Sequence, residues 1–158
     1  GLSNLIETLE PQGFLKLGLY SKFARLEIIK ARELIKEKKI KPTLDEIRNF
    51  RNDILNGEIK QLSQITNWAD FYSTSMCRDL CFHSQEKCYS LLEIKHMIEI
   101  ANLEFLGFIA SKDIKDKFQS KNKNIESLKD LKLWDSFEKL NPNSFREMYQ
   151  FWTKKSIK

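Results

Sequence analysis

The stretch LEPQGFLKLGLY, residues 9–20, decides the fold class. Pro11 and Gly13 predict a turn, because proline fixes φ and glycine permits a positive φ. The residues that follow, 14–20, are apolar except for Lys16 and Gly18. A nearly continuous apolar run of this length is typical of a strand covered on both faces, as in a parallel sheet. We therefore expect a strand over residues 14–20.

Two further apolar runs predict strands farther along the chain, at about 103–110 (LEFLGFIA) and 148–153 (MYQFWT). Helical segments separate them, and two of these begin with capping boxes, at residues 43–46 and 90–93. Strands that alternate with helices indicate the α/β class. Three strands make a small sheet with exposed apolar surface, so we expect part of a larger sheet, completed by another segment or chain.

Composition excludes several classes of protein. The 158 residues amount to about one domain, and 41% hydrophobic with 31% charged residues excludes a disordered chain. No apolar stretch is long enough to span a membrane, and no basic head with an apolar core marks a secretory signal. The net charge of +5 comes from lysines scattered along the chain, so binding to nucleic acid is not expected. Three cysteines without a secretion signal predict free thiols in the cytoplasm.

Three sequence blocks resemble a known family. Residues 9–13 running into FLKLGLYS are similar to the L-x-P-G-G element of class I S-adenosylmethionine-dependent methyltransferases, with Gln12 in place of the first glycine. Residues 70–91 (DFYSTSMCRDLCFHSQEKCYSL), with GLYSKFAR at 18–25 and MYQFWTKK at 148–155, resemble bacterial methyltransferases that often follow tetratricopeptide repeats. The similarity covers essentially the whole chain, in the family's order.

The resemblance implies the C-terminal part of a seven-stranded Rossmann-like sheet. Residues 14–20 would be the fifth strand, 103–110 the sixth and 148–153 the seventh, an antiparallel strand between the other two. Residues 21–90 would form a helical insert that faces the substrate, within a single partial domain 1–158. Helical spacing of the apolar residues already at 2–9 agrees with a chain that starts within a structure.

The cofactor-binding half of the family is absent from this sequence. Members bind S-adenosylmethionine through a G-x-G-x-G turn and an acidic residue, because glycines allow close backbone approach and a carboxylate holds ribose hydroxyls. This chain has no G-x-G. We expect it to be inactive alone and to need an N-terminal cofactor-binding half, with tetratricopeptide repeats as a further upstream partner. The methyl acceptor is unknown.

The residues most suited to chemistry lie in the block 70–91. His83 is the candidate base, because imidazole titrates near neutrality, and Glu86 follows three residues later. Arg78 and Asp79 are candidate substrate contacts, and a guanidinium can clamp an anionic group. The alternatives are that His83 and Glu86 only join the insert to the sheet, and that Arg78 pairs with Asp79 or Glu86.

Two tyrosines complete the candidate substrate site. Tyr20 ends the first strand, where ligands gather in open α/β sheets, and Tyr72 could line the same pocket. The alternatives are that Tyr20 is partly buried with a partner for its hydroxyl, and that Tyr72 belongs to the core. The spacing C-x3-C-x-H-x4-C over residues 77–88 differs from the tighter C-x2-C pairs of zinc sites, so no metal is expected. Trp134 and Trp152 lie on apolar faces and are expected in the core.

Two other functions remain open on the sequence. A non-enzymatic α/β interaction module would pair with a partner chain through its exposed sheet edge. A basic nucleic-acid-binding domain would need a steep salt dependence of binding.

Overall fold

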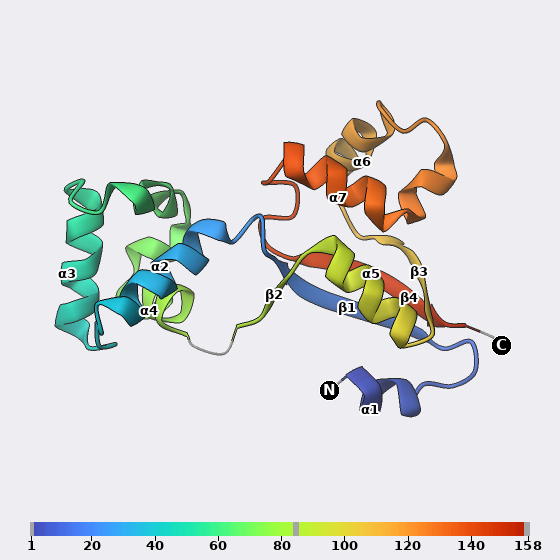
Figure 1. Ribbon diagram of the computed structural model, residues 1–158, viewed down its shortest axis with the longest axis horizontal. Coiled ribbons are helices and arrows are strands. Elements are labelled where there is room, and N and C mark those ends of the chain that lie inside the picture. Colours follow the sequence, from blue (N-terminus) through green and yellow to red (C-terminus); the bar gives the residue numbers. More distant parts are fainter. Residues whose placement is uncertain (1, 84–85, 157–158) are drawn as a thin grey trace. The chain divides into compact units, whose positions relative to one another are not determined.

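The computed structural model describes residues 2–83 and 86–156, which fall into two compact units (Figure 1). The sheet unit comprises Gly1–Ala24 and Cys88–Lys158, and the helical unit comprises Arg25–Lys87. The helical unit is therefore inserted into the sheet unit. Its bounds differ by a few residues at each end from the insert expected at 21–90.

The sheet unit holds four strands and the helices that pack on them. In chain order its elements are α1 (Leu2–Glu7), β1 (Phe14–Ser21), β2 (Cys88–Tyr89), α5 (Leu91–Ile100), β3 (Leu103–Phe108), α6 (Lys112–Gln119), η3 (Ile125–Lys129), α7 (Leu131–Leu140) and β4 (Tyr149–Lys155). The capping box expected before α5 is present, since Ser90 Oγ accepts from the Glu93 backbone and the Glu93 carboxylate accepts from the Ser90 backbone.

The strands lie in the order β2-β1-β4-β3. β4 runs antiparallel to both β1 and β3, with Leu17 opposite Phe151 and Phe108 also opposite Phe151. β1 and β3 therefore run in the same direction with β4 between them, and β2 pairs parallel with the last two residues of β1. The mixed α/β class is confirmed, as is the antiparallel position of the last strand between the two expected earlier ones.

One face of the sheet carries the core of this unit. Leu15, Leu17 and Leu19 of β1 alternate with residues on the other face, and Tyr149, Phe151 and Thr153 of β4 lie opposite them in the ladder. The helices contribute the apolar residues that cover this face: Leu91, Ile94 and Ile98 of α5, Phe118 of α6, and Leu131, Trp134 and Phe137 of α7. The Trp134 and Phe118 rings stack at a centroid distance of 3.8 Å.

The opposite face of the sheet is less covered and mixes apolar side chains with charged ones such as Lys16 and the Lys154–Glu104 pair. Phe14 is 63% exposed and Trp152 is 41% exposed. Both border a shallow hollow, together with residues 106–108. Trp134 lies in the core as expected, but the same expectation for Trp152 is wrong, because residue 152 follows the alternation of β4 to the less covered face.

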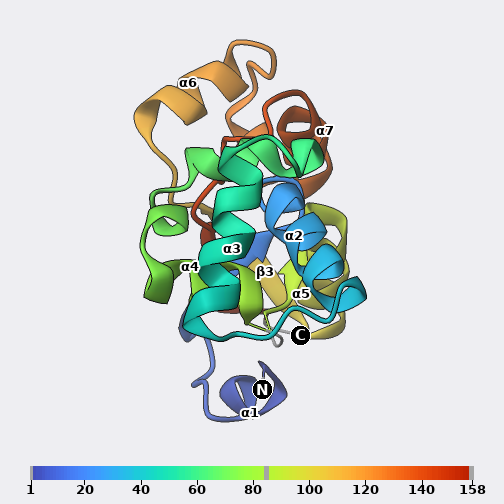
Figure 2. The same cartoon turned by 90° about the vertical axis from the view of Figure 1, so that its left-hand side faces the viewer.

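The helical unit has its own core. Its elements are α2 (Leu26–Glu37), α3 (Leu44–Leu55), η1 (Lys60–Asn67), η2 (Ala69–Tyr72) and α4 (Thr74–Phe82) (Figures 1 and 2). The core gathers apolar side chains from all of them, among them Ile28, Ala31, Ile47, Phe50, Leu62, Phe71 and Cys77. Thr43 caps α3 by accepting from the Glu46 backbone, but the predicted capping box is incomplete, because the Glu46 carboxylate accepts from the Lys41 backbone instead.

The strand bounds differ in detail from the expected ones. The expected strand 103–110 ends at Phe108, after a register shift between Phe105 and Gly107, and the expected strand 148–153 runs instead from Tyr149 to Lys155. The short strand β2 was not predicted, since two residues leave no detectable alternation. Within the described residues, no helix combines the length and apolarity needed to cross a membrane.

The two faces of β4 give a stability prediction. Phe151→Ala removes a fully buried ring between β1 and β3 and should lower the free energy of unfolding by about 3–5 kcal/mol. Trp152→Ala, one residue along on the less covered face, should lower it by about 1 kcal/mol or less. Urea unfolding followed by far-ultraviolet circular dichroism measures both, and equal losses would contradict this assignment of the faces.

Candidate ligand site at the carboxyl edge of the sheet

Several chain segments meet at one edge of the sheet. β1 ends at Ser21 and β3 ends at Phe108, and because the two strands run in the same direction their carboxyl ends share an edge. β4 is antiparallel, so the loop that precedes Tyr149 reaches the same edge. Ligands of open α/β sheets bind outside the carboxyl ends of the strands. This edge is therefore the place to look for a site in the sheet unit.

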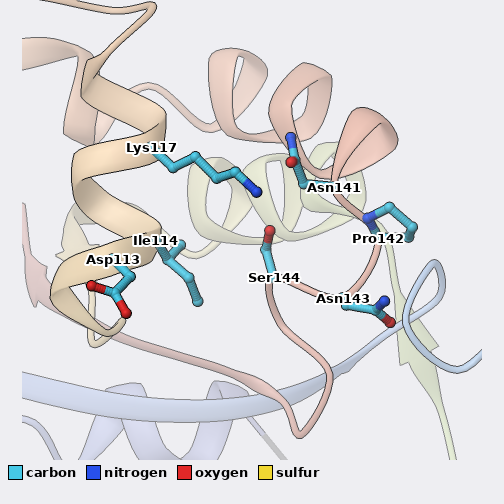
Figure 3. Close-up of a pocket in the computed structure, with 7 residues that line it drawn as sticks. All are labelled: Asp113, Ile114, Lys117, Asn141, Pro142, Asn143 and Ser144. Atoms are coloured by element: carbon cyan, nitrogen blue, oxygen red, sulfur yellow. The ribbon is translucent and has the colours of Figure 1, made fainter. Parts of the chain in front are cut away.

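A polar pocket lies between the helix that follows β3 and the loop that precedes β4 (Figure 3). Its volume is about 310 Å³, at the lower end of the range for small-molecule sites. It is lined by Asp113, Ile114 and Lys117 of α6 and by Asn141, Pro142, Asn143 and Ser144 of the loop.

The pocket lining combines the Lys117 ammonium and the Asp113 carboxylate with neutral polar groups. The Lys117 side chain extends from α6 toward the loop, and the Ser144 hydroxyl is turned toward its end (Figure 3). The loop is held in shape by Asn141, whose Nδ2 donates to the Phe137 carbonyl at 3.0 Å and whose carbonyl accepts from the Ser144 backbone at 3.0 Å. Such a lining can bind a polar or anionic group of a ligand.

A buried hydrogen-bonded cluster, which we call the Glu138 cluster, joins three elements at the same edge. Its members are Ser21 at the end of β1, Tyr149 at the start of β4 and Glu138 near the end of α7. Ser21 Oγ donates to Glu138 Oε1 at 2.5 Å, and Tyr149 Oη and Glu138 Oε2 share a hydrogen bond of 2.5 Å. Burial raises the pKa of Glu138 and also that of Tyr149.

Lys22, next along the chain, ties β1 to the segment that returns from the helical unit. Its backbone N–H donates to the Tyr89 carbonyl at 2.9 Å, and its Nζ lies 2.6 Å from Glu93 Oε1. The Lys22 ammonium and the Ser90 backbone lower the pKa of Glu93 to about 2.

The six residues singled out by sequence do not form one cluster. Tyr20 is half-buried at the end of β1, in the sheet unit, whereas the other five belong to the helical unit. Tyr72 and His83 are both exposed, but Tyr72 lies before the first residue of α4 and His83 lies after its last residue. The nine residues of α4 separate them by about 14 Å of helix. Arg78 and Asp79 are exposed on α4 itself.

Glu86 makes contacts that stabilise the fold. Its Oε1 lies 2.9 Å from Arg25 Nη1 and its Oε2 lies 3.1 Å from Arg32 Nη2, with all three side chains less than a fifth exposed. Arg32 also donates to the Leu80 carbonyl, and the Arg25 guanidinium lies over the Trp68 ring. Both oxygens of Glu86 therefore accept from cations of the same helical unit, which is a structural role other than the link to the sheet raised as the alternative.

The cysteines offer no coordinating set. Cys77 and Cys81 are buried free thiols on α4, while Cys88 lies in β2 of the sheet unit. Among the described residues, no three His, Cys, Asp or Glu side chains are grouped so that they could hold a metal ion.

Sequence reasoning missed the Glu138 cluster and the pocket. A signal for the cluster was present: residue 138 follows Leu131 and Trp134 by seven and four positions, so it falls on the apolar face of α7. A glutamate there predicts a buried carboxyl with hydrogen-bond partners. The pocket has no comparable signal, because it forms only when residues 141–144 fold back beside α6.

Comparison with known proteins assigns no family. No family model matches this chain, and no curated protein matches it significantly.

The arginine pair of Glu86 gives the first site prediction. Glu86→Gln should lower the free energy of unfolding by about 2 kcal/mol, because two largely buried guanidinium groups lose their carboxylate. Asp79→Asn, on the exposed surface of α4, is the control and should change it by less than about 0.5 kcal/mol. Thermal unfolding of both variants measures this, and an unchanged stability of Glu86→Gln would contradict a stabilising role for these ion pairs.

The Lys22–Glu93 pair gives a pH prediction. Because the pKa of Glu93 is lowered from 4.5 to about 2, the pair stabilises the folded state above pH 4.5, and this contribution is lost as the pH falls through about 2. Lys22→Met should raise the Glu93 pKa toward 4.5, though not fully, since Ser90 still donates to the carboxylate. Titration of the Glu93 side-chain carbonyl by NMR measures the shift, and Lys95→Met, which removes the neighbouring partner of Glu99, should leave it unchanged.

Proposed function

We propose that this chain is the C-terminal, acceptor-binding portion of an S-adenosylmethionine-dependent methyltransferase. The observation that carries the proposal is the strand order β1-β4-β3 with β4 antiparallel to both neighbours. The sequence resemblance implies this order for the fifth, seventh and sixth strands, and a helical unit follows β1 as the resemblance implies for the substrate-facing insert.

The open edge of β1 supports a larger sheet. β2 pairs with β1 only at Tyr20 and Ser21. From Phe14 to Leu19, the edge of β1 that faces away from β4 has no strand beside it in the described part of the chain. Unpaired strand edges are normally covered or occupied, because their backbone groups can hydrogen-bond to another strand. A parallel strand from a cofactor-binding half would fit there.

The described residues do not form the glycine-rich turn that binding of S-adenosylmethionine needs. Its binding needs a glycine-rich turn after a strand, where the backbone can approach the ligand. Gly13 packs against the Leu9 side chain before β1, Gly18 and Gly107 lie within strands, and Gly57 lies in the helical unit. We therefore assign cofactor binding to a separate N-terminal half, and this chain to binding of the acceptor.

Two surfaces are candidates for the acceptor. The pocket at the carboxyl edge offers Lys117 and Ser144 for a polar or anionic group. The helical unit offers exposed Arg78, Asp79 and His83, of which His83 is the proposed base for a hydroxyl or amine. Glu86 is not included as a base, because Arg25 and Arg32 occupy its carboxylate.

The alternative function is a protein-interaction module without enzymatic activity. The same open edge of β1 and the exposed apolar residues Phe14 and Trp152 would favour it. Under this alternative the chain would form a stable homodimer or bind a partner chain, and it would show no dependence on the cofactor.

The test compares this chain with a longer polypeptide that joins it to the segment preceding it in the same protein. Isothermal titration with S-adenosylmethionine should show saturable binding by the longer polypeptide and none by this chain. The longer polypeptide should also transfer the methyl group to an acceptor. Absence of cofactor binding by the longer polypeptide, together with a homodimer in light scattering, would overturn the proposal in favour of the interaction module.

Variants within this chain separate the two acceptor surfaces. In the longer polypeptide, Lys117→Ala should raise the KM for an anionic acceptor about 10-fold or more, because one charge-assisted hydrogen bond is lost, and leave cofactor binding unchanged. Lys121→Ala, just beyond α6 and outside the pocket lining, is the control. If His83→Ala alone affects the reaction, the acceptor binds at the helical unit.

A further inference from the structure

The Glu138 cluster buries an acidic group that forms no ion pair within the described part of the chain. Glu138 is 0% exposed, and Ser21 and Tyr149 are 1% and 0% exposed. The hydrogen-bond partners of its carboxyl group are the two hydroxyls of Ser21 and Tyr149. An ionised carboxylate buried in this way lacks the compensation that a paired cation provides.

Counting protons distinguishes the two charge states of Glu138. The three groups make three contacts, because Tyr149 Oη also lies 3.0 Å from Ser21 Oγ. The two hydroxyls supply two protons. If Glu138 is ionised, both protons point to its oxygens and the contact between the hydroxyls contains none. If Glu138 is protonated, three protons serve three contacts, and each contact is a hydrogen bond.

When Glu138 is protonated, every hydrogen-bonding position of the Ser21 hydroxyl is also used. Ser21 Oγ accepts from the Ala24 backbone N–H at 3.1 Å. In the closed ring it donates to Glu138, accepts from Tyr149 and accepts from Ala24, which uses its one donor and both acceptor positions. Glu138 then donates to Tyr149. The two contacts of 2.5 Å are at the short end for O–H···O bonds, which either charge state allows.

Among the described residues, no cation lies within ion-pair distance of the Glu138 carboxyl group. On α7, Asp135 lies on the same side and its charge also raises the pKa of Glu138, while Lys139 Nζ pairs with Asp135 Oδ2 at 2.7 Å. Lys22, just after β1, pairs with Glu93 of α5. The remaining charged groups of α5, which packs on α7, are Lys95, His96 and Glu99, of which Lys95 pairs with Glu99.

We propose that Glu138 is a neutral, proton-donating carboxylic acid at neutral pH, and that its proton closes a ring of hydrogen bonds that joins β1, β4 and α7. Loss of this proton opens the ring at the carboxyl edge of the sheet. Glu138 is thus a positioning residue: it holds the end of β1 and the turn at Ala24, through which the chain enters the helical unit. The proposal does not depend on the methyltransferase assignment.

The proton on Glu138 makes the folded protein less stable as the pH rises above the pKa that Glu138 has in the unfolded chain. In the unfolded chain Glu138 titrates near 4.5, so above that pH the folded state holds one proton more than the unfolded state. Stability therefore falls as the pH rises, until the folded protein also loses the proton. One proton corresponds to a tenfold change in the unfolding equilibrium constant for each pH unit.

The test compares the wild type with Glu138→Gln, whose amide keeps the shape and a donor without a titrating proton. Hydrogen exchange of the most protected amides in β1 and β4 gives the unfolding equilibrium constant from pH 5 to 8. Relative to Glu138→Gln, the constant of the wild type should rise about tenfold per pH unit over part of this range. Parallel pH profiles would overturn the proposal.

Two further measurements keep the outcome decisive if Glu138→Gln does not fold. Infrared difference spectroscopy of the wild type should show the C=O stretch of a protonated carboxyl at pH 7, and its absence would overturn the proposal. Asp135→Asn removes the neighbouring negative charge, so that band should then disappear at a lower pH than in the wild type. Glu93→Gln is the control and should leave the band unchanged.

Discussion

The antiparallel pairing of β4 with both β1 and β3 is the interaction on which the sheet unit depends. β1 and β3 do not touch each other in the ladder; each is hydrogen-bonded to β4. The strand nearest the C-terminus therefore joins segments separated by some eighty residues, and it contributes Tyr149, Phe151 and Thr153 to the buried face. α5 and α7 pack on the face that these three strands form together.

The placement of β4 also creates the chemistry of the carboxyl edge. Because β4 runs against its neighbours, the loop before it reaches the edge at which β1 and β3 end. This brings Tyr149 to Ser21 and Glu138, and it brings residues 141–144 beside α6. A parallel strand in the same slot would send that loop to the opposite edge. The polar pocket and the Glu138 cluster are thus two results of one strand direction.

The sequence was sufficient for the fold class and three of the four strands, because long apolar runs and capping boxes are local signals, whereas the order of the strands was expected only from the family resemblance. It was less informative about the site. His83, Arg78 and Asp79 are conspicuous in the sequence, but the structure leaves them exposed on or beside α4. The partners of Glu86, Arg25 and Arg32, lie more than fifty positions away, and residue spacing alone does not reveal such contacts.

The partners of the buried residues could not be predicted from the sequence either. Tyr149 lies 128 positions from Ser21, and Glu138 lies 117 positions from it. A glutamate on an apolar helix face indicates that some partner exists, but only the folded sheet identifies which hydroxyls supply it. Trp152 was misassigned for a related reason: strand alternation predicts two faces, but not which of them the helices cover.

The connection between the two units has a consequence for how such a protein can change. The chain leaves the sheet after Ser21 and returns at Cys88, and these positions are neighbours because Tyr20 pairs with Cys88 and Ser21 with Tyr89. Adjacent strand positions lie about 5 Å apart, so the ladder constrains only the two ends of the intervening segment, not its length. The sequence and the length of residues 25–87 can therefore change during evolution while the strands keep their register.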